Sequence, residues 1–299
     1  MDDPADVLAA LRDALEAEVR GGGRYVPHVD VPPPLSPTHA FDAPGEEAAR
    51  HDDEGAGFTS PRPEPPASDD APDAMPTVDL FGAPLPEAPD PSLSPYERID
   101  ARIPEGHVVK PAKTLAELES IVRAHVFIEL DKHRILPVFG TGDAEAGLMV
   151  IGEAPGADED RAGEPFVGRA GQLLNKILAA IGFTREEVYI TNILKSRPPG
   201  NRDPEPDEIE GHLPILLKQI VLIQPKVILC VGKTSGNALL GRRSSLGALR
   251  DKEHSFEGIP LYVTYHPAAL LRNEQWKRPT WEDVKLMRTR YDELTKGRG

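Results

Sequence analysis

Residues 148–156 read LMVIGEAPG, and this stretch decides the fold. Four apolar residues in a row predict a short strand that is buried on both faces. The glycine and proline that follow predict a sharp turn at its end. Residues 261–268, which read LYVTYHPA, repeat the arrangement of an apolar run followed by polar residues. Since ligands of open α/β sheets bind at the carboxyl ends of the strands, we expect both turns to lie at one ligand site.

Other apolar runs extend this pattern along the chain. The strands are predicted at residues 148–152, 188–194, 226–232 and 260–265. Apolar residues at helical spacing occur in segments 171–178, 206–223 and 280–296. Strands that alternate with helices predict an α/β fold with three layers, α/β/α, around a central, mainly parallel four-stranded sheet. A single folded domain is predicted over residues 105–299.

The first hundred residues have a different composition. They hold 18 of the 32 prolines and 22 acidic against 6 basic residues, whereas residues 101–299 hold 27 acidic and 28 basic residues. Few of them are aliphatic, so residues 21–104 are predicted to be a disordered, acidic, Pro-rich linker. Residues 1–20 are predicted to form a short amphipathic helix, either partly formed or docked on a partner. The acidic charge therefore belongs to the N-terminal region and does not argue against nucleic acid as a partner of the domain.

The cysteine content and the hydropathy of the chain indicate where in the cell the protein is expected to lie. The single cysteine, Cys230, lies within an apolar run and is expected to be an inert core thiol. No apolar run approaches the length of a membrane span, and the N-terminus lacks the basic-then-apolar order of a signal peptide. We expect a cytoplasmic monomer that does not engage membranes.

The motifs, taken together, resemble family 4 of the uracil-DNA glycosylase superfamily. The resemblance covers about residues 115–295, nearly all of the predicted domain. Several spaced motifs in the family's order are a stronger signal than any one of them. They are GEAPG at 152–156 with Glu159 and Asp160, PFVGRAG at 165–171, NILK at 192–195, RPPGNR at 197–202, HPA at 266–268 and LRN at 271–273.

The resemblance implies a DNA repair enzyme that flips uracil out of the DNA and hydrolyses its N-glycosidic bond, leaving an abasic site. Phe166 would stack on the flipped base, and Asn192 would pair with its polar edge, because an amide offers both a donor and an acceptor. Ala154 would line the base pocket.

The implied catalytic residues are His266, Glu159 and Glu153. His266 would donate a hydrogen bond to uracil O2 as negative charge builds there. Glu159 matches the position that orients or activates the attacking water, and Glu153 lies at the strand end. Schiff-base chemistry is not expected, because no lysine occupies a matching position, so the enzyme is predicted to be monofunctional.

The implied DNA contacts fall into two groups. An apolar wedge followed by a cation would fill the gap left by the flipped base, and it is formed by Leu270, Leu271 and Arg272. Phosphate contacts are expected from Lys195, Arg197 and Arg202.

The sequence departs from family 4 in its cysteines. Those enzymes hold a [4Fe–4S] cluster through four cysteines, since such clusters need thiolate ligands. The matching positions here are His125, Ile128, Ser196 and His212. We expect no cluster and no other metal, although a zinc site that uses His125 and His212 stays open.

The N-terminal region carries one further motif. Thr77-Val78-Asp79-Leu80-Phe81 looks like the short peptides by which bacterial repair and replication proteins bind the sliding clamp, although the usual leading glutamine is absent. A chance apolar cluster is the other interpretation. The acidic charge of residues 1–100 is also expected to compete with DNA, so that deleting them would tighten binding at low salt.

Two other functions stay open at this point. The domain could be a glycosylase for another deaminated base, such as hypoxanthine, because the pocket residues favour uracil without excluding other bases. It could also be a catalytically weak DNA-damage-binding module that is recruited through its N-terminal region.

Overall fold

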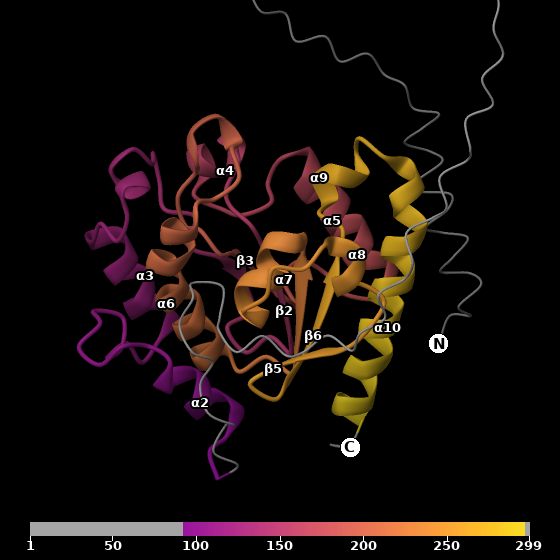
Figure 1. The fold of residues 1–299 in the computed structure, drawn as a ribbon, viewed down its shortest axis with the longest axis horizontal. Coiled ribbons are helices and arrows are strands. Elements are labelled where there is room, and N and C mark those ends of the chain that lie inside the picture. Colours follow the sequence, from indigo (N-terminus) through magenta and orange to yellow (C-terminus); the bar gives the residue numbers. More distant parts are fainter. Residues whose placement is uncertain (1–91, 297–299) are drawn as a thin grey trace, which may run out of the picture. The chain divides into compact units, whose positions relative to one another are not determined.

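The computed structural model describes residues 92–296, and Figure 1 shows their arrangement. The expected N-terminal helix at 1–20, the clamp-like segment at 77–81 and nearly all of the expected linker lie outside the described residues.

The described residues contain one sheet with strand order β1-β3-β2-β4-β6-β5. Its strands are β1 (Thr141–Gly142), β2 (Leu148–Gly152), β3 (Tyr189–Asn192), β4 (Val227–Val231), β5 (His254–Phe256) and β6 (Ile259–Thr264). The four expected strands are parallel to one another and form the centre. The expected count of four is wrong, because β1 and β5 add antiparallel edges. These edge strands are too short to show a periodic apolar pattern in the sequence.

Helices cover both faces of the sheet. The first face carries α3 (Leu115–Ala124), α6 (Pro206–Ile223) and α7 (Lys233–Leu240), and the second carries α5 (Arg169–Ala180) and α10 (Lys277–Thr295). All residues of β2 and β4 are buried. Because side chains alternate across a strand, Met149 and Ile151 join the first cluster while Leu148 and Val150 join the second. The three-layer α/β/α fold is confirmed.

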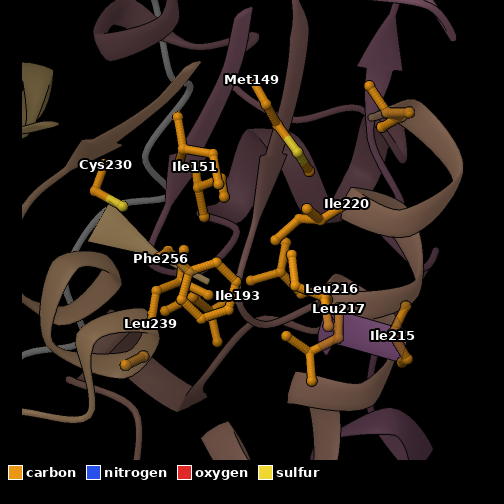
Figure 2. Packing of buried hydrophobic residues seen from close by; sticks show 14 of the residues in the cluster. Met149, Ile151, Ile193, Ile215, Leu216, Leu217, Ile220, Cys230, Leu239 and Phe256 are labelled. Carbon is orange, nitrogen blue, oxygen red and sulfur yellow. The ribbon is translucent and has the colours of Figure 1, made fainter. Parts of the chain in front are cut away.

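The first cluster is visible in close-up. Met149 and Ile151 of β2 gather with Ile220, Leu216 and Leu217 of α6 in Figure 2. Cys230 lies in the same cluster, fully buried, and burial raises the pKa of its thiol to about 12. The thiol is therefore a core group, as the apolar run around it indicates.

The fold begins earlier than residue 105. Helix α2 (Pro95–Ala101) packs on α6, and Ile99 and Ile103 are fully buried. Its N-terminus is capped by Ser94, whose hydroxyl accepts a hydrogen bond from the Glu97 backbone N–H at 3.3 Å. The expected linker boundary at residue 104 is therefore corrected. The composition around α2 is rich in proline and typical of a linker, but the helix contributes Ile99 to the hydrophobic core.

Short elements complete the described part. They are the helices α4 (Ala157–Ala162), α8 (Leu246–Leu249) and α9 (Pro267–Leu270), with the 3₁₀ turns η1 (Glu129–Lys132), η2 (Pro199–Asn201) and η3 (Glu274–Trp276). Helices α4 and α9 lie at the upper end of the domain in Figure 1. Between residues 92 and 296, no helix has both the length and the apolar character needed to cross a bilayer.

Candidate active site

A cleft of about 410 Å³ lies at the carboxyl ends of the four parallel strands. The strand-to-helix turns supply its walls: Glu153 to Gly156 after β2, Asn192 at the end of β3, Gly232 after β4 and His266 after β6. The remaining lining residues are Glu159, Phe166, Ala170, Pro198, Asn201, Arg202, Asp203, Ala268, Ala269 and Arg272. The structure therefore brings the GEAPG and HPA turns together, as the strand pattern predicts.

Asn192 forms the innermost polar wall of the cleft. Its side chain is buried, and its Oδ1 has no hydrogen-bond partner among the described residues. Gly152 makes room for it, because a Cβ at that position would lie 2.2 Å from Asn192 Oδ1 and 2.7 Å from the Phe166 ring. A buried oxygen without a donor is costly, so the arrangement suits a ligand that brings its own N–H.

Phe166 presents its ring to the same part of the cleft and has an unusual backbone. Its φ of 55° lies in the left-handed region, which is rare for a bulky side chain. Arg185 holds this turn from behind: its guanidinium donates to the Phe166 carbonyl at 3.3 Å and pairs with Glu164 at 2.9 Å. Gly171 lets α5 pass closely, since a Cβ there would lie 1.7 Å from the Phe166 carbonyl oxygen. Sequence reasoning missed Arg185, which lies outside the motifs.

The His266 ring packs beside the Phe166 ring, with ring centroids 5.5 Å apart. It is the N-cap of α9, where its Nδ1 accepts a hydrogen bond from the Ala268 backbone N–H at 3.2 Å. That bond places the ring proton on Nε2. Burial, assisted by the nearby Arg272 charge, lowers the pKa of His266 to about 4. The imidazole is thus neutral at pH 7 and offers one N–H donor.

The carboxylates of Glu153, Glu159 and Asp203 line the cleft. Glu159 in α4 is held by two backbone donors, with Oε2 accepting from Gly156 at 3.1 Å and Oε1 from Gly168 at 3.3 Å. Burial raises the pKa of Glu153, and a hydrogen bond with Thr234 partly opposes this. Glu159 is therefore fixed between the two motif loops. Asp160 faces away and accepts a hydrogen bond from the Ile135 backbone N–H at 3.0 Å.

Two expected DNA contacts are wrong. Lys195 is fully buried, and its Nζ bonds to protein groups, so it cannot reach a phosphate. Leu270 is also buried, in a small apolar hollow with Leu173, Ile177 and Trp281. Both corrections have one cause: the local sequence does not tell an inward-facing side chain from an outward-facing one at a helix or strand end.

The other expected contacts lie at or near the surface of the cleft. Arg272 is exposed and lines the cleft, and its neighbour Leu271 is partly exposed. Arg197 is partly exposed and donates to Asn201 at 2.7 Å. Arg202 lines the cleft but is already paired with Glu208 at 2.6 Å.

Three of the four cysteine-matching positions, Ile128, Ser196 and His212, contact the buried carboxylate of Asp131. Asp131 accepts hydrogen bonds from Ser196 and from His212 Nε2 at 3.1 Å, and it forms an ion pair with Arg134 at 3.0 Å. The backbone N–H groups of Phe127 and Ile128 donate to its other oxygen at 2.7 and 3.2 Å. Burial raises the pKa of Asp131, but the hydrogen bonds from His212 and Ser196 outweigh it and hold the pKa well below its usual range.

The histidines near this carboxylate are already engaged. His212 Nδ1 accepts from the Lys195 backbone N–H at 2.9 Å, so Nε2 carries the proton that is donated to Asp131. His125 Nδ1 bonds to the Ile121 carbonyl at 2.8 Å. Over residues 92–296, no group of three or more His, Cys, Asp or Glu side chains is placed to hold a metal ion. Sequence reasoning missed Asp131 because it lies in a charged run that is typical of an exposed turn.

Comparisons with known proteins agree with this geometry. Residues 139–285 match the family described as "Uracil DNA glycosylase superfamily". The Type-4 uracil-DNA glycosylase of Pyrobaculum aerophilum is 43% identical over 182 residues, which are 58% of this chain and 92% of that protein. The corresponding enzyme of Archaeoglobus fulgidus is 40% identical over 52% of this chain and 83% of its own length. The Type-4 uracil-DNA glycosylase of Thermotoga maritima is 39% identical over 52% of this chain and 83% of its own length. The chain belongs to the uracil-DNA glycosylase superfamily.

Proposed function

We propose that this chain removes uracil from DNA by hydrolysing the N-glycosidic bond and leaves an abasic site. The observation that carries the proposal is the buried, unpartnered Oδ1 of Asn192, which lines the same cleft as His266 and Phe166. Uracil offers an N3–H donor, two carbonyl acceptors and a flat face, so it complements all three groups. The similarity to Type-4 uracil-DNA glycosylases supports the same assignment.

The bond that breaks joins sugar C1′ to base N1. Its electron pair leaves with the base, which departs as an anion, and His266 Nε2–H donates to the O2 atom on which the charge builds. A neutral imidazole suits this role, since it keeps its N–H without adding a charge that must be desolvated. The cationic sugar is left beside the carboxylates of Glu153 and Glu159.

Water completes the reaction. Its oxygen bonds to C1′, and its proton passes to the Glu159 carboxylate, whose position is fixed by Gly156 and Gly168. Return of that proton to the departed uracil anion, directly or through solvent, gives free uracil and restores the Glu159 carboxylate. The other product is an abasic sugar with a hydroxyl at C1′. None of the residues that line the cleft is a lysine, which supports a monofunctional hydrolase without a Schiff base.

The residues at the cluster-matching positions do not fit an iron–sulfur cluster. The side chains of Ser196 and His212 already form hydrogen bonds with Asp131, and His212 also bonds to the Lys195 backbone N–H. The side chain of Ile128 has no atom that can bind a metal. We infer that the Asp131 network ties together the segments around residues 128, 196 and 212 without metal. The same bonds leave no ring nitrogen of His212 free for zinc, so the open alternative of a zinc site is not supported.

The proposed DNA surface is smaller than the sequence suggests. Arg272 and Leu271 follow the His266 motif at the mouth of the cleft and are proposed to enter the duplex where the base leaves. Arg197 is proposed to contact a phosphate. Arg202 would have to break its ion pair with Glu208 before it could contact a phosphate. The clamp contact of residues 77–81, the monomeric state and the cytoplasmic location stay predictions.

A gel assay tests the proposal. The substrate is an oligonucleotide with one uracil, single-stranded or paired with guanine or adenine, and alkali reveals abasic sites. Asn192→Ala and Glu159→Ala should each lower the rate by about a hundredfold or more, since each removes a group that acts in the transition state. Glu186→Ala, at an exposed site outside the cleft, is the matched control and should leave the rate unchanged.

The outcomes separate the functions. Uracil release that depends on both cleft residues supports the hydrolase. Release from hypoxanthine but not uracil would move the assignment to another deaminated base, and retained binding without release of either base would indicate a damage-binding module.

A further inference from the structure

Lys195 is the largest fully buried side chain of the domain that carries a titratable group. It follows β3 by three residues, so its stem runs beneath the strand end that carries Asn192. Lysine is almost never fully buried unless it is paired with an opposite charge. Its burial here therefore needs a physical reason.

Three oxygens surround its Nζ atom. Thr191 Oγ1 lies at 2.7 Å, the Asn192 backbone carbonyl at 2.6 Å and Gln219 Oε1 at 2.7 Å. The Thr191 hydroxyl donates its own hydrogen bond to the Phe139 carbonyl at 2.7 Å. The Gln219 amide nitrogen donates to that carbonyl at 2.9 Å. All three oxygens can therefore only accept from Nζ, which needs three protons, so the group is an ammonium.

This ammonium has no carboxylate partner among the described residues, since no ion pair involves it. Burial lowers the pKa of Lys195 well below its ordinary value, so the fold holds the positive charge at a cost in stability. Lys218, the other buried lysine of the domain, differs because its Nζ pairs with Asp100 at 3.0 Å. A charge kept without a counter-ion can stabilise negative charge that appears only during a reaction.

The link to the cleft runs through Asn192. Nζ donates to the backbone carbonyl of Asn192, while the side chain of the same residue forms the polar wall of the cleft. We propose that Lys195 is a positioning residue of the glycosylase: it fixes the Asn192 backbone and places a positive charge behind the base-binding end of the cleft. There it stabilises the electron pair that moves from the C1′–N1 bond onto the departing base. This inference rests on the proposed uracil excision.

The test measures single-turnover excision of uracil and of 5-fluorouracil from the same oligonucleotide. Fluorine stabilises the departing anion, so excision of 5-fluorouracil should depend less on a positive charge in the protein. Lys195→Met keeps the length of the side chain and removes the charge. We expect the uracil rate to fall roughly tenfold or more, and the 5-fluorouracil rate to fall clearly less, so that the ratio of the two rates rises severalfold.

The ratio separates electrostatics from folding. Both rates come from one preparation, so a partly unfolded variant lowers them equally and leaves the ratio unchanged. Lys218→Met is the matched control, because it removes a buried lysine that is paired away from the cleft, and it should leave the ratio as in the wild type.

An equal loss on both substrates in Lys195→Met would overturn the inference and assign Lys195 a structural role only. The proposed function is judged separately, by the wild-type protein. If the wild type releases neither base, uracil excision itself fails, whatever the variant does.

Discussion

Asn192 and His266 line the same cleft and supply the two polar groups of the proposed reaction. The first offers a buried oxygen without a donor, and the second a neutral imidazole whose free proton is fixed on Nε2 by the Ala268 N–H. Neither group needs to change its protonation for the base to bind. The proposed polar partners of the base are thus in place before it arrives, which limits the reorganisation that the proposed reaction requires.

The low pKa of His266 predicts a pH dependence of stability. Between pH 6.5 and about 4 the native state binds fewer protons at this residue than the unfolded chain does, so the free energy of unfolding falls as the pH falls through this window. Asparagine also caps helices but does not titrate. Wild type should therefore lose about 2–3 kcal/mol more than His266→Asn between pH 7 and pH 4.

Urea unfolding of both proteins across this pH range checks the prediction. Other titrating groups, His212 included, contribute to both curves and cancel in the difference. Parallel curves for the two proteins would show that His266 has an ordinary pKa in the folded state.

The sequence predicts the cleft residues well where they follow strand ends. Glu153 and His266 follow apolar runs, Asn192 lies within the predicted strand at 188–194, and all three line the cleft. The motifs predict that Lys195 and Leu270 contact DNA, but motif position carries no information on burial, and both side chains are buried. No local pattern in the sequence indicates the role of Arg185, since its partners lie about twenty residues earlier in the chain.

At the scale of elements, the Asp131 carboxylate joins three segments that are distant in sequence. It collects donors from η1 and its flanks, from Ser196 after β3 and from His212 in α6. Because the charge is fully buried and fully hydrogen-bonded, the removal of one oxygen leaves several donors unsatisfied. Packing and hydrogen bonds thus hold the loop that begins next to Asn192.

Asp131→Asn should lower the free energy of unfolding by about 3 kcal/mol or more, since it breaks a buried ion pair with Arg134 and turns an amide toward hydrogen-bond donors. Glu129→Gln is the matched control from the same turn. Its partner Lys132 is exposed, so the loss should stay below about 1 kcal/mol. Urea denaturation measures both, and equal losses would refute a special role for Asp131.

The sequence predicts the four central strands of the sheet but not the two edge strands, β1 and β5. The β2 and β4 strands are buried on both faces, and continuous apolar runs reveal them. The β1 and β5 strands have two and three residues, and α2 lies among prolines, so none of them has a periodic pattern long enough to detect. Only the tertiary contacts, such as the burial of Ile99, define these elements.

At the scale of the whole molecule, charge is divided sharply along the chain. Residues 1–91 carry 20 acidic and 5 basic side chains, whereas residues 92–299 carry 29 of each. The N-terminal segment can therefore compete with DNA phosphates for the cations near the cleft, as the sequence suggests.

Deleting residues 1–91 should tighten the binding of uracil-free DNA, and the gain should shrink as salt rises from low to physiological concentration. The deletion ends before α2, because the burial of Ile99 and Ile103 makes residues up to 104 part of the fold. Fluorescence anisotropy at several salt concentrations measures the effect. Unchanged affinity at low salt would exclude competition by the N-terminal segment.

Uracil excision without a metal is tested by one experiment that combines catalysis with metal analysis. The full chain is purified, its iron and zinc contents are measured, and single-turnover release of uracil is followed in EDTA, with the free base identified by mass spectrometry. We predict uracil release at a rate that EDTA does not change, less than about 0.1 iron or zinc per chain, and loss of release in Asn192→Ala. Uracil release that rises and falls with bound iron would contradict the account.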